Sequence, residues 1–216
     1  MARETLAAKD RAYRYTKDRV LDGTFAGGEL ISEGQVADAL QMSRTPVREA
    51  FLRLEVEGLL RLYPKRGAVV VPVSPREIEA VLETRELIEN HAVAKLLAKP
   101  EPARAVVVDR LRELLAEQAD LRERGDARGF VDADRRFHST IVAEAQNPIL
   151  SELYESLRDR QLRMGVDAVV RDPNRPDTIH DEHTALVDMI DKADADTFRQ
   201  RLAHHLGGTR TTLLGP

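Results

Sequence analysis

The sequence predicts a mainly α-helical protein. A small N-terminal domain of helices and one β-hairpin precedes a C-terminal antiparallel all-α bundle of about six helices. Short apolar segments with helical spacing open the chain, two β-prone runs around a turn follow, and helix-forming segments fill the remainder. Aromatic residues make up only 4%, and long stretches rich in Ala, Leu, Glu and Arg favour helix. A chain of 216 residues can bury two cores, and we place the domains at residues 1–75 and 76–216.

The composition limits the class of protein. The chain contains no cysteine, which excludes disulfides and thiolate metal sites. No apolar run resembles a signal peptide or approaches the length of a membrane span, so we expect a cytoplasmic protein with no membrane partner. The net charge of −4 argues at first against nucleic acid, but residues 1–75 carry a net +2 and the remainder −6. Because local clustering of basic residues sets the field at a phosphate backbone, DNA binding stays open.

Three helices and a tight turn are expected in the N-terminal domain. A helical segment at about 7–21 stops at the turn signal Asp22-Gly23, and a second one spans 33–40. A third begins at Ser43, because a hydroxyl caps free amides and the following proline tolerates the first turn. This helix ends at Gly58. Its apolar residues fall on one stripe: Val47, Ala50, Phe51 and Leu54.

A β-hairpin is expected after the third helix. Residues 59–62 and 68–73 are short apolar, β-prone runs, and Tyr-Pro-Lys-Arg-Gly at 63–67 is typical of a hairpin tip. Pro72, Ser74 and Pro75 then mark a linker. The order helix, turn, helix, hairpin is that of a winged helix-turn-helix, whose second helix enters the major groove of DNA.

Candidate DNA contacts fall at the start of the third helix and at the hairpin tip. Arg44 and Arg48 lie one turn apart and off the apolar stripe, where a guanidinium can pair with O6 and N7 of guanine. The hydroxyls of Ser43 and Thr45 suit phosphate contacts. Three residues form a basic tip that can enter the adjacent minor groove: Lys65, Arg66 and Gly67. Two arginines on a helix face are by themselves more often solvated charges, so the whole ordered arrangement carries the prediction.

The motif Ser-Arg-Thr-Pro-Val-Arg-Glu-Ala at 43–50 resembles the signature of the GntR family of bacterial regulators. Leu-Glu at 54–55, Glu-Gly-Leu at 57–59, Gly-Glu-Leu at 28–30 and Arg-Gly at 66–67 fit the same pattern, which covers residues 10–73. The resemblance implies a DNA-binding regulator with four contact positions: Arg44, Thr45, Arg48 and the wing tip at Gly67. The chain departs from the pattern at Gly34, where some members have a DNA-contacting arginine, and we predict no contact there.

Six helices are expected in the C-terminal domain, with breaks at prolines, glycines or short polar loops. They span residues 76–98, 103–124, 126–146, 148–170, 177–191 and 194–213. Antiparallel helices of this length, joined by short connections, are typical of a bundle. The sequence shows no internal repeat or low-complexity tract.

One carboxylate and three histidines of the helical domain form a candidate metal site. Asp134 and His138 are four residues apart and project from one helix face, and His183 and His205 lie on two later helices. If these helices converge, the donors meet inside the bundle. The set suits a borderline divalent ion such as zinc, nickel or manganese, with positions left for water or a carboxylate effector. An Asp/His pair at this spacing is more often a surface ion pair, so spacing alone leaves both interpretations open.

Three motifs of this domain resemble the FCD ligand-binding domain of the FadR-like subfamily of the same regulators. They are Asp-x-x-Phe-His at 134–138, Glu-His at 182–183 and Ala-His-His-Leu at 203–206, and the resemblance covers about 77–213. It implies a divalent metal with four ligands: Asp134, His138, His183 and His205. Because the matching histidine directly precedes Leu206, His205 is favoured over His204. His180 is expected at the surface or behind the ligands, and His91 on a helix surface.

The same resemblance implies two effector contacts. Arg85 corresponds to an arginine that in many relatives faces the cavity and can pair with an effector carboxylate. A helix-surface salt bridge with Glu86 or Glu89 is almost equally supported. Asn147 corresponds to an asparagine that often lies near the metal, although a simple helix C-cap is the alternative.

These features predict a DNA-binding transcription repressor and not an enzyme. We expect a homodimer on a palindromic operator, whose affinity for double-stranded operator DNA is controlled by a small organic acid bound beside the metal. Two alternatives stay open. In one, the metal ion itself is the signal. In the other, the four ligands activate water in a helical-bundle metalloenzyme, although no general base is evident and an enzyme would not need the arginine pair.

Overall fold

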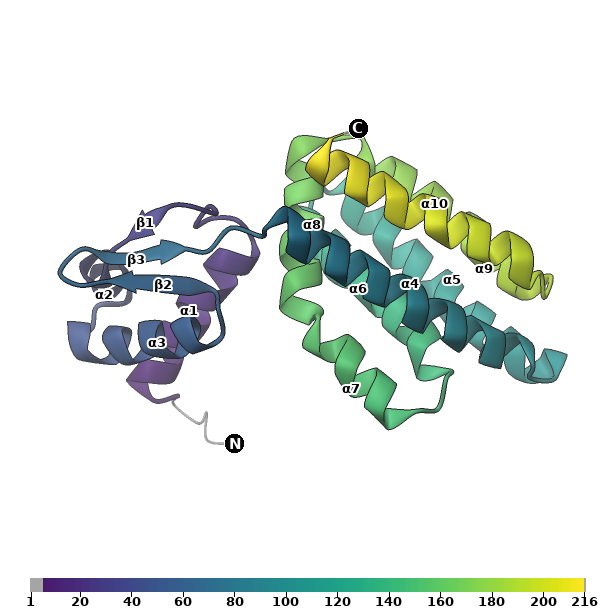
Figure 1. Cartoon of the computed structure of the whole chain (residues 1–216), viewed down its shortest axis with the longest axis horizontal. Helices are drawn as coiled ribbons and strands as arrows, with labels where there is room; N and C mark the ends of the chain where they lie inside the picture. Colours follow the sequence, from purple (N-terminus) through teal and green to yellow (C-terminus); the bar gives the residue numbers. More distant parts are fainter. Residues whose placement is uncertain (1–5, 216) are drawn as a thin grey trace. The chain divides into compact units, whose positions relative to one another are not determined.

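The computed structural model describes residues 6–215, and the chain divides into two compact units (Figure 1). One unit ends at Val73 and the other begins at Ser74. The first contains three helices and a three-stranded sheet, and the described elements of the second are all helices. The predicted fold class, a winged helix-turn-helix followed by an all-α domain, is confirmed.

The N-terminal unit adds one strand to the expected elements. Its elements are α1 (Ala8–Leu21), β1 (Leu30–Ile31), α2 (Glu33–Leu40), α3 (Arg44–Val56), β2 (Leu60–Tyr63) and β3 (Gly67–Val70). The sheet has the order β1-β3-β2, and both strand pairs are antiparallel. No sequence pattern indicated β1, because two residues are too few to show an alternation of apolar and polar positions.

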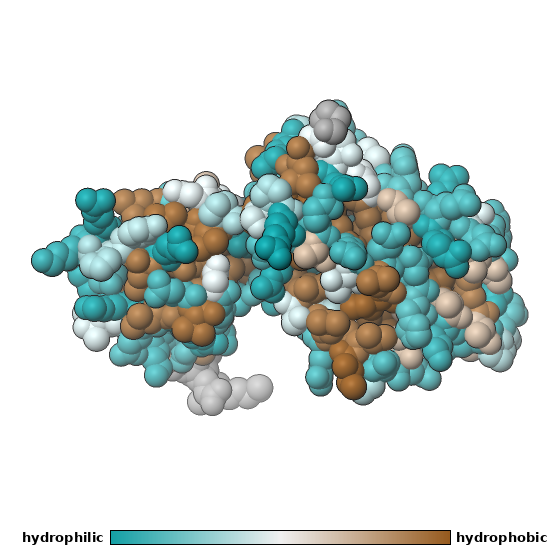
Figure 2. Space-filling view, viewed as in Figure 1, coloured by the Kyte–Doolittle hydropathy of each residue, from teal (hydrophilic) through white to brown (hydrophobic). Residues whose placement is uncertain are grey.

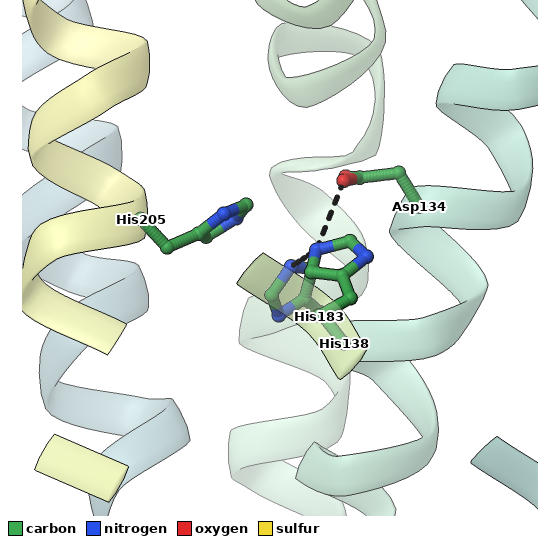
Figure 3. A group of neighbouring side chains, drawn as sticks. All are labelled: Asp134, His138, His183 and His205. Carbon is green, nitrogen blue, oxygen red and sulfur yellow. Dashed lines mark hydrogen bonds and ion pairs between the residues drawn. The ribbon is translucent and has the colours of Figure 1, made fainter. Parts of the chain in front are cut away.

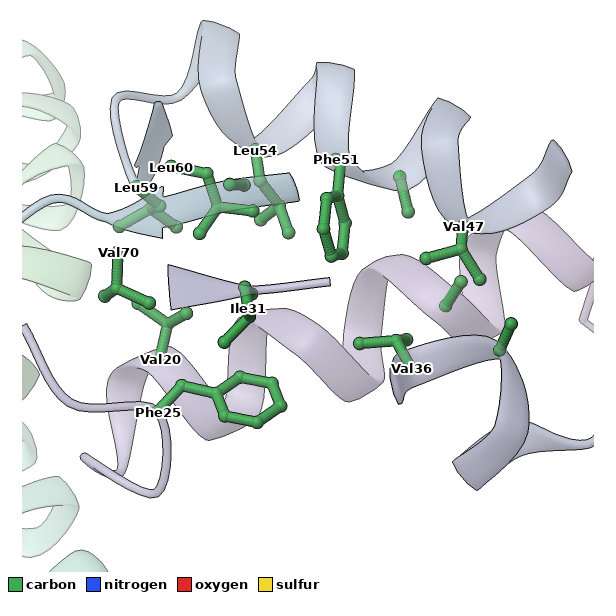
Figure 4. Close-up of a cluster of buried hydrophobic side chains, with 14 residues drawn as sticks. Val20, Phe25, Ile31, Val36, Val47, Phe51, Leu54, Leu59, Leu60 and Val70 are labelled. Carbon is green, nitrogen blue, oxygen red and sulfur yellow. The ribbon is translucent and has the colours of Figure 1, made fainter. Parts of the chain in front are cut away.

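A single hydrophobic cluster holds the N-terminal unit together (Figure 4). The predicted stripe of α3 faces this cluster, and Val47, Phe51 and Leu54 are completely buried. Ile31 of β1 and Val36 of α2 belong to the same cluster, and α1 packs along α3. Burial of such side chains contributes about 1.5–3 kcal/mol each. The cluster therefore makes α3 a rigid support for the side chains on its opposite, exposed face.

The start of α3 differs from the expectation in one respect. Ser43 occupies the N-cap position with an extended backbone, but its side chain makes no capping hydrogen bond. The expected capping role of this hydroxyl is therefore wrong. The physical reason is that Pro46 stands at the third position of the helix, where an N-cap side chain usually finds an N–H, and proline has none. The Ser43 hydroxyl is exposed and is available for a hydrogen bond to a partner molecule.

The β2–β3 hairpin forms the predicted wing. Tyr63 pairs with Gly67 at its end, and residues 64–66 make the turn. Gly67 has a φ of 111°, a backbone conformation that favours glycine, and a Cβ at this position would collide with the backbone oxygen of Ile31. Glycine therefore allows β1 to approach the base of the wing tip.

The C-terminal unit contains seven helices among the described residues, where six were expected. They are α4 (Pro75–Leu97), α5 (Glu101–Glu123), α6 (Ala127–Ala143), α7 (Pro148–Ser156), α8 (Arg158–Arg171), α9 (Arg175–Asp191) and α10 (Ala195–Leu214). The prediction of a single helix at 148–170 is wrong, because the helix is interrupted at Leu157. This residue keeps nearly helical angles (φ −83°, ψ −5°), and no proline or glycine marks the break. The helix-forming composition continues across it, so the sequence gives no signal there.

Helix α6 lies at the centre of the C-terminal unit. It packs against α4, α5, α7 and α8, while α9 and α10 pack against each other and against α5 and α4, respectively. Phe130, Phe137 and Ile141 of α6 are buried. Because α6 is surrounded in this way, polar side chains on its inner face are withdrawn from water.

The visible surface of the C-terminal unit is mainly hydrophilic (Figure 2). Apolar side chains gather on it where α7 reaches the surface, and Ile149 and Leu153 of this helix are 74% and 46% exposed. Across residues 6–215, every helix is too short or too polar to span a membrane.

Candidate metal centre and nucleic-acid interface

A carboxylate and three imidazoles from three helices meet inside the C-terminal unit (Figure 3). Asp134 and His138 come from α6, His183 from α9 and His205 from α10. One ligand atom of each residue lies within 4.8 Å of the others. The three histidines are buried, and Asp134 is partly exposed. The structure thus brings together all four residues that the sequence indicated as candidate metal ligands, which we call the four-residue cluster.

The inner atoms of the cluster are close to one another. His138 Nε2 and His183 Nε2 are 3.0 Å apart, and His183 Nε2 lies 3.4 Å from Asp134 Oδ1. The ring of Phe137 stacks on His183, with the centroids 4.3 Å apart. Nitrogen and oxygen atoms at these separations, next to an apolar wall, form a compact donor set for a single cation.

Each imidazole also has an oxygen of another residue close to its Nδ1, on the side away from the cluster. The three Nδ1–oxygen pairs are His138 with Glu89 (2.8 Å), His183 with Gln118 (3.0 Å) and His205 with Glu182 (2.8 Å). The first pair is close in distance but is not aligned as a hydrogen bond. For His183 and His205, the acceptor at Nδ1 keeps the proton on that nitrogen, so the lone pair is left on Nε2. Such outer partners are what metal-ligating histidines usually have.

Burial favours the neutral form of two of these imidazoles, His183 and His205. Desolvation lowers the pKa of His183 well below its ordinary value, and the neighbouring His205 and His138 lower it further. Desolvation also lowers the pKa of His205, against the opposing effect of its hydrogen bond to Glu182. A metal binds the neutral imidazole, so burial keeps His183 and His205 in the form that can bind.

Arg175 supports His205 and Glu182 from the far side of the cluster. Its Nη2 donates to the backbone oxygen of His205 (3.0 Å) and to Thr209 Oγ1 (3.1 Å), and its Nη1 donates to Glu182 Oε1 (3.3 Å). The guanidinium lies against Gly208, where a Cβ would be 2.9 Å from Nη1. Arg175 was not identified from the sequence. The one related feature of the sequence is the pair Gly207-Gly208 in the helix that carries His205, which leaves room for a side chain from another helix.

A small cavity adjoins the four-residue cluster. Its lining comes from five helices: Val81, Arg85, Phe130, Val131, Asp134, Gln161, Met164, Gly165, Ala168, Ile179, His205 and Thr209. The open volume of about 30 Å³ is enough for about two water molecules. Because Asp134 and His205 belong to both the cluster and the cavity wall, a molecule in the cavity would lie beside the cluster.

Arg85 lies inside the unit and not on a helix surface. It is 7% exposed, and its Nε donates to Glu89 Oε1 at 2.8 Å, an oxygen that also accepts from the hydroxyl of Tyr154 at 2.7 Å. Burial raises the pKa of the Glu89 carboxyl, but the charge of Arg85 and the contact with His138 outweigh it and leave this pKa below its usual range. The Nη2 of Arg85 has no hydrogen-bond partner among residues 6–215.

Other candidate residues of this domain lie outside the cluster and the cavity lining. Asn147 caps the N-terminus of α7, where its Oδ1 accepts from the amides of Ile149 and Leu150, and it does not cap the end of α6. The side chain of His204 is 75% exposed, which leaves His205 as the inward histidine. His180 is half-buried on α9, and His91 is exposed on α4.

The candidate DNA-contact side chains at the start of α3 and at the wing tip are exposed. Arg44, Thr45 and Arg48 are exposed at the start of α3, on the side away from its buried stripe. Lys65 and Arg66 are exposed at the wing tip. These positions leave the side chains available to a partner molecule. A Cβ at position 34 would lie 3.5 Å from Nη2 of Arg44, so this guanidinium lies beside the first turn of α2.

Two family models match the two units. Residues 8–70 match the model described as bacterial regulatory proteins, gntR family, and residues 80–208 match the FCD domain model. Together the two matches span most of both units.

Individual proteins show the same similarity. The chain is 37% identical over 132 residues to an HTH-type transcriptional regulator in the TAR-I ttuE-ttuC' intergenic region of Agrobacterium vitis, covering 61% of this chain and 77% of the relative. It is 28% identical over 219 residues to the galactonate operon transcriptional repressor of Escherichia coli, covering 91% and 92%. A solved structure of a putative transcriptional regulator GntR from Rhodococcus sp. RHA1 has the same fold, with a TM-score of 0.74, 23% identity and coverage of 96% and 97%.

Proposed function

The chain belongs to the GntR family of bacterial regulatory proteins and carries an FCD domain, and from this premise we propose that it is a repressor controlled by a small carboxylate metabolite. Its relatives are transcription regulators, and it is a DNA-binding transcriptional regulator of the same family. In the proposal, residues 1–75 bind the operator and residues 76–216 bind the effector and dimerise. The effector binds beside a divalent metal ion and changes the affinity for the operator.

In the proposal, exposed residues of α3 and the wing bind the DNA. Arg44 and Arg48 would pair with base edges in the major groove, and Ser43 and Thr45 with phosphates. The wing tip, Lys65 to Gly67, would enter the neighbouring minor groove. In a dimer, two such units would meet half-sites about one helical turn apart, which predicts a palindromic operator.

One observation carries the metal part of the proposal: one ligand atom from each of three buried histidines converges with one from Asp134, while the Nδ1 atoms of His183 and His205 pair with acceptors of other residues. Asp134, His138, His183 and His205 would hold the ion. The nitrogen-rich donor set without thiolate fits zinc, nickel or manganese. When bound, the ion supplies a positive charge that can anchor a carboxylate.

Arg85 supports the carboxylate part of the proposal. Its guanidinium lines the cavity, its Nη2 has no hydrogen-bond partner in the described chain, and a guanidinium pairs well with a carboxylate. The name of the Escherichia coli relative refers to galactonate, itself a carboxylate. Asn147 is not among the cavity-lining residues, so the proposed effector contact rests on Arg85.

The small size of the cavity connects effector binding to regulation. About 30 Å³ does not admit an organic acid without movement of the surrounding helices. An effector that binds only the enlarged form shifts the population toward that form. It releases DNA if the enlarged form has the lower operator affinity, and this differential affinity is the condition that regulation requires.

The test measures operator affinity of the full chain in three states. Operator duplexes are first selected from a random pool, and binding is followed by fluorescence anisotropy at fixed salt. The chelated protein and the protein loaded with Zn²⁺, Ni²⁺ or Mn²⁺ should bind similarly. Addition of carboxylates to the loaded protein should weaken binding by about 5- to 150-fold.

Other results would point elsewhere. A large effect of metal alone would replace the proposal with a metal sensor. Turnover of the carboxylate would replace it with a metalloenzyme. Full operator affinity in the presence of metal and saturating carboxylate would show that this domain does not control DNA binding in the proposed way.

A further inference from the structure

Two buried N–H groups that belong to cavity-lining residues have no hydrogen-bond partner in the described chain: Nη2 of Arg85 and Nε2 of Gln161. Arg85 is 7% exposed and Gln161 8% exposed, so water outside the protein reaches neither side chain freely. Gln161 comes from α8, a helix that carries none of the four cluster residues. In the proposed function Arg85 pairs with the effector carboxylate, and Gln161 has no role.

The chemistry of these two groups defines what a ligand must bring. Both are donors, so the ligand must offer an acceptor to each. A guanidinium is charged and pairs best with a carboxylate, whereas a carboxamide is neutral and pairs well with a neutral oxygen. Thr209 Oγ1, another polar atom of the lining residues, already accepts a hydrogen bond from Arg175.

We propose that Gln161 recognises a second oxygen of the effector, the hydroxyl or oxo oxygen that hydroxy- and oxocarboxylic acids carry beside the carboxylate. This inference rests on the proposed function, because it assumes that the cavity beside the cluster binds the effector carboxylate. Gln161 is then a specificity-determining residue. It distinguishes such acids from plain monocarboxylic acids of the same length.

The remaining wall of the cavity supports one orientation of the ligand. Val81, Phe130 and Met164 are apolar side chains, so a polar ligand group gains nothing by turning toward them. Gly165 allows α8 to approach α6 closely, because a Cβ at this position would collide with the side chain of Val131. This close approach fixes the part of α8 from which Gln161 lines the cavity.

The first test needs no ligand. A buried donor without a partner destabilises the empty protein, and methionine has nearly the length of glutamine without the polar group. The variant Gln161→Met should therefore raise the midpoint of thermal unfolding of the metal-loaded full chain. Gln200→Met, at an exposed position on α10, is the matched control and should leave it unchanged. A lowered midpoint for Gln161→Met, at unchanged metal content, would show that the amide is already satisfied and would overturn the inference.

The second test compares ligands that share one carbon skeleton. Lactate, pyruvate and propionate are titrated calorimetrically into the metal-loaded full chain, followed by the six-carbon pair gluconate and hexanoate. We expect the acids with a second oxygen to bind about tenfold to hundredfold more tightly than their plain counterparts. Gln161→Met should remove this preference while binding of the plain acids persists, and Gln200→Met should retain it.

The outcomes separate this inference from the proposed function. Equal binding of both kinds of acid to the wild-type chain, or a preference that persists in Gln161→Met, would overturn the inference and leave the proposed function intact. If the folded, metal-loaded protein binds none of the five acids, the carboxylate cavity itself is wrong, and both proposals fail together.

Discussion

The two polar clusters of this chain differ in how their side chains are held. Arg44 and Arg48 are exposed on one face of α3, whose opposite face is buried in a hydrophobic core. The three histidines of the four-residue cluster are buried, and each has an oxygen of a second polar residue within 3.0 Å of its Nδ1. In the first case the backbone is fixed and the side chains are free. In the second case the side chains themselves are fixed.

This difference has a physical cause. An exposed arginine is hydrated until it meets a partner, so its removal changes binding and little else. A buried imidazole has lost its hydration, and its neighbours are arranged to satisfy it. Removal of one member of such a set therefore affects the others. We expect local effects for substitutions at the DNA surface and coupled effects for substitutions around the cluster.

The largest effect is expected for His183→Ala. This substitution removes a central donor, leaves Gln118 without its partner and opens a gap beside Phe137. Loss of an outer partner alone typically lowers metal affinity about ten- to hundredfold, so loss of a ligand should lower it more than about a hundredfold. Metal content after dialysis and calorimetric titration measure this. His204→Ala, at the exposed neighbour of His205, is the control, and retention of a full equivalent of metal by His183→Ala would contradict the assignment.

The next effect is expected for Arg48→Ala, at the DNA surface. Loss of a bidentate base contact costs about 1–3 kcal/mol, so operator affinity should fall about ten- to hundredfold. The fold and the metal content should stay as in the wild type, which a circular dichroism melt and metal analysis would show. Arg11→Ala, at an exposed position of α1, is a matched control for the loss of one positive charge. Normal operator binding by Arg48→Ala in a mobility-shift assay would refute its role.

A smaller, indirect effect is expected for Gly208→Ala. The new methyl group would lie 2.9 Å from Nη1 of Arg175 and displace the guanidinium from Glu182 and from the backbone of His205. Metal affinity should fall about tenfold with no ligand removed. Gly207→Ala, where a Cβ would meet nothing within 4 Å, should have no such effect. Equal metal affinities of the two variants would mean that Arg175 does not position the cluster.

The smallest effect is expected when the pH is lowered and the Glu57 carboxyl of the N-terminal unit becomes protonated. Burial raises the pKa of Glu57, but hydrogen bonds from Lys17 and Tyr13, together with the charges of Lys17 and Arg53, leave it below its ordinary value of 4.5. A lowered folded-state pKa stabilises the protein above about pH 4.5, and this contribution is lost as the pH falls through the folded-state value. Because the group is largely exposed to solvent, the contribution should stay below about 1 kcal/mol.

Urea unfolding of the full chain between pH 6 and pH 3 measures this contribution. The difference in unfolding free energy between the wild type and Glu57→Gln should shrink as the pH falls. A constant difference over the whole range would show that the ion pair with Lys17 does not stabilise the folded state.

The helical pattern was sufficient to predict most of the fold. The stripe of α3 and the glycine that ends this helix are local signals, and so are the prolines near the starts of the later helices. The break at Leu157 was not predictable, because no residue there disfavours helix. Strand β1 was not predictable either, since it exists only through its pairing with β3.

The candidate site was predictable to a smaller extent. Helical spacing placed Asp134 and His138 on one face, and family resemblance supplied the other two histidines. Glu89, Gln118 and Arg175 could not be found in this way, because they lie on α4, α5 and α9 and no fixed spacing links them to the cluster. Which polar residue stands behind each imidazole is decided by the packing of the helices.

The position of the cluster along the chain has a consequence for the unfolded polypeptide. His138 and His183 are 45 residues apart and belong to α6 and α9, with α7 and α8 between them. An ion bound to both would close this segment into a ring, and ring closure restricts an unfolded chain more the longer the enclosed segment is. In a chain without cysteine, such an ion would be a reversible cross-link that takes the place of a disulfide.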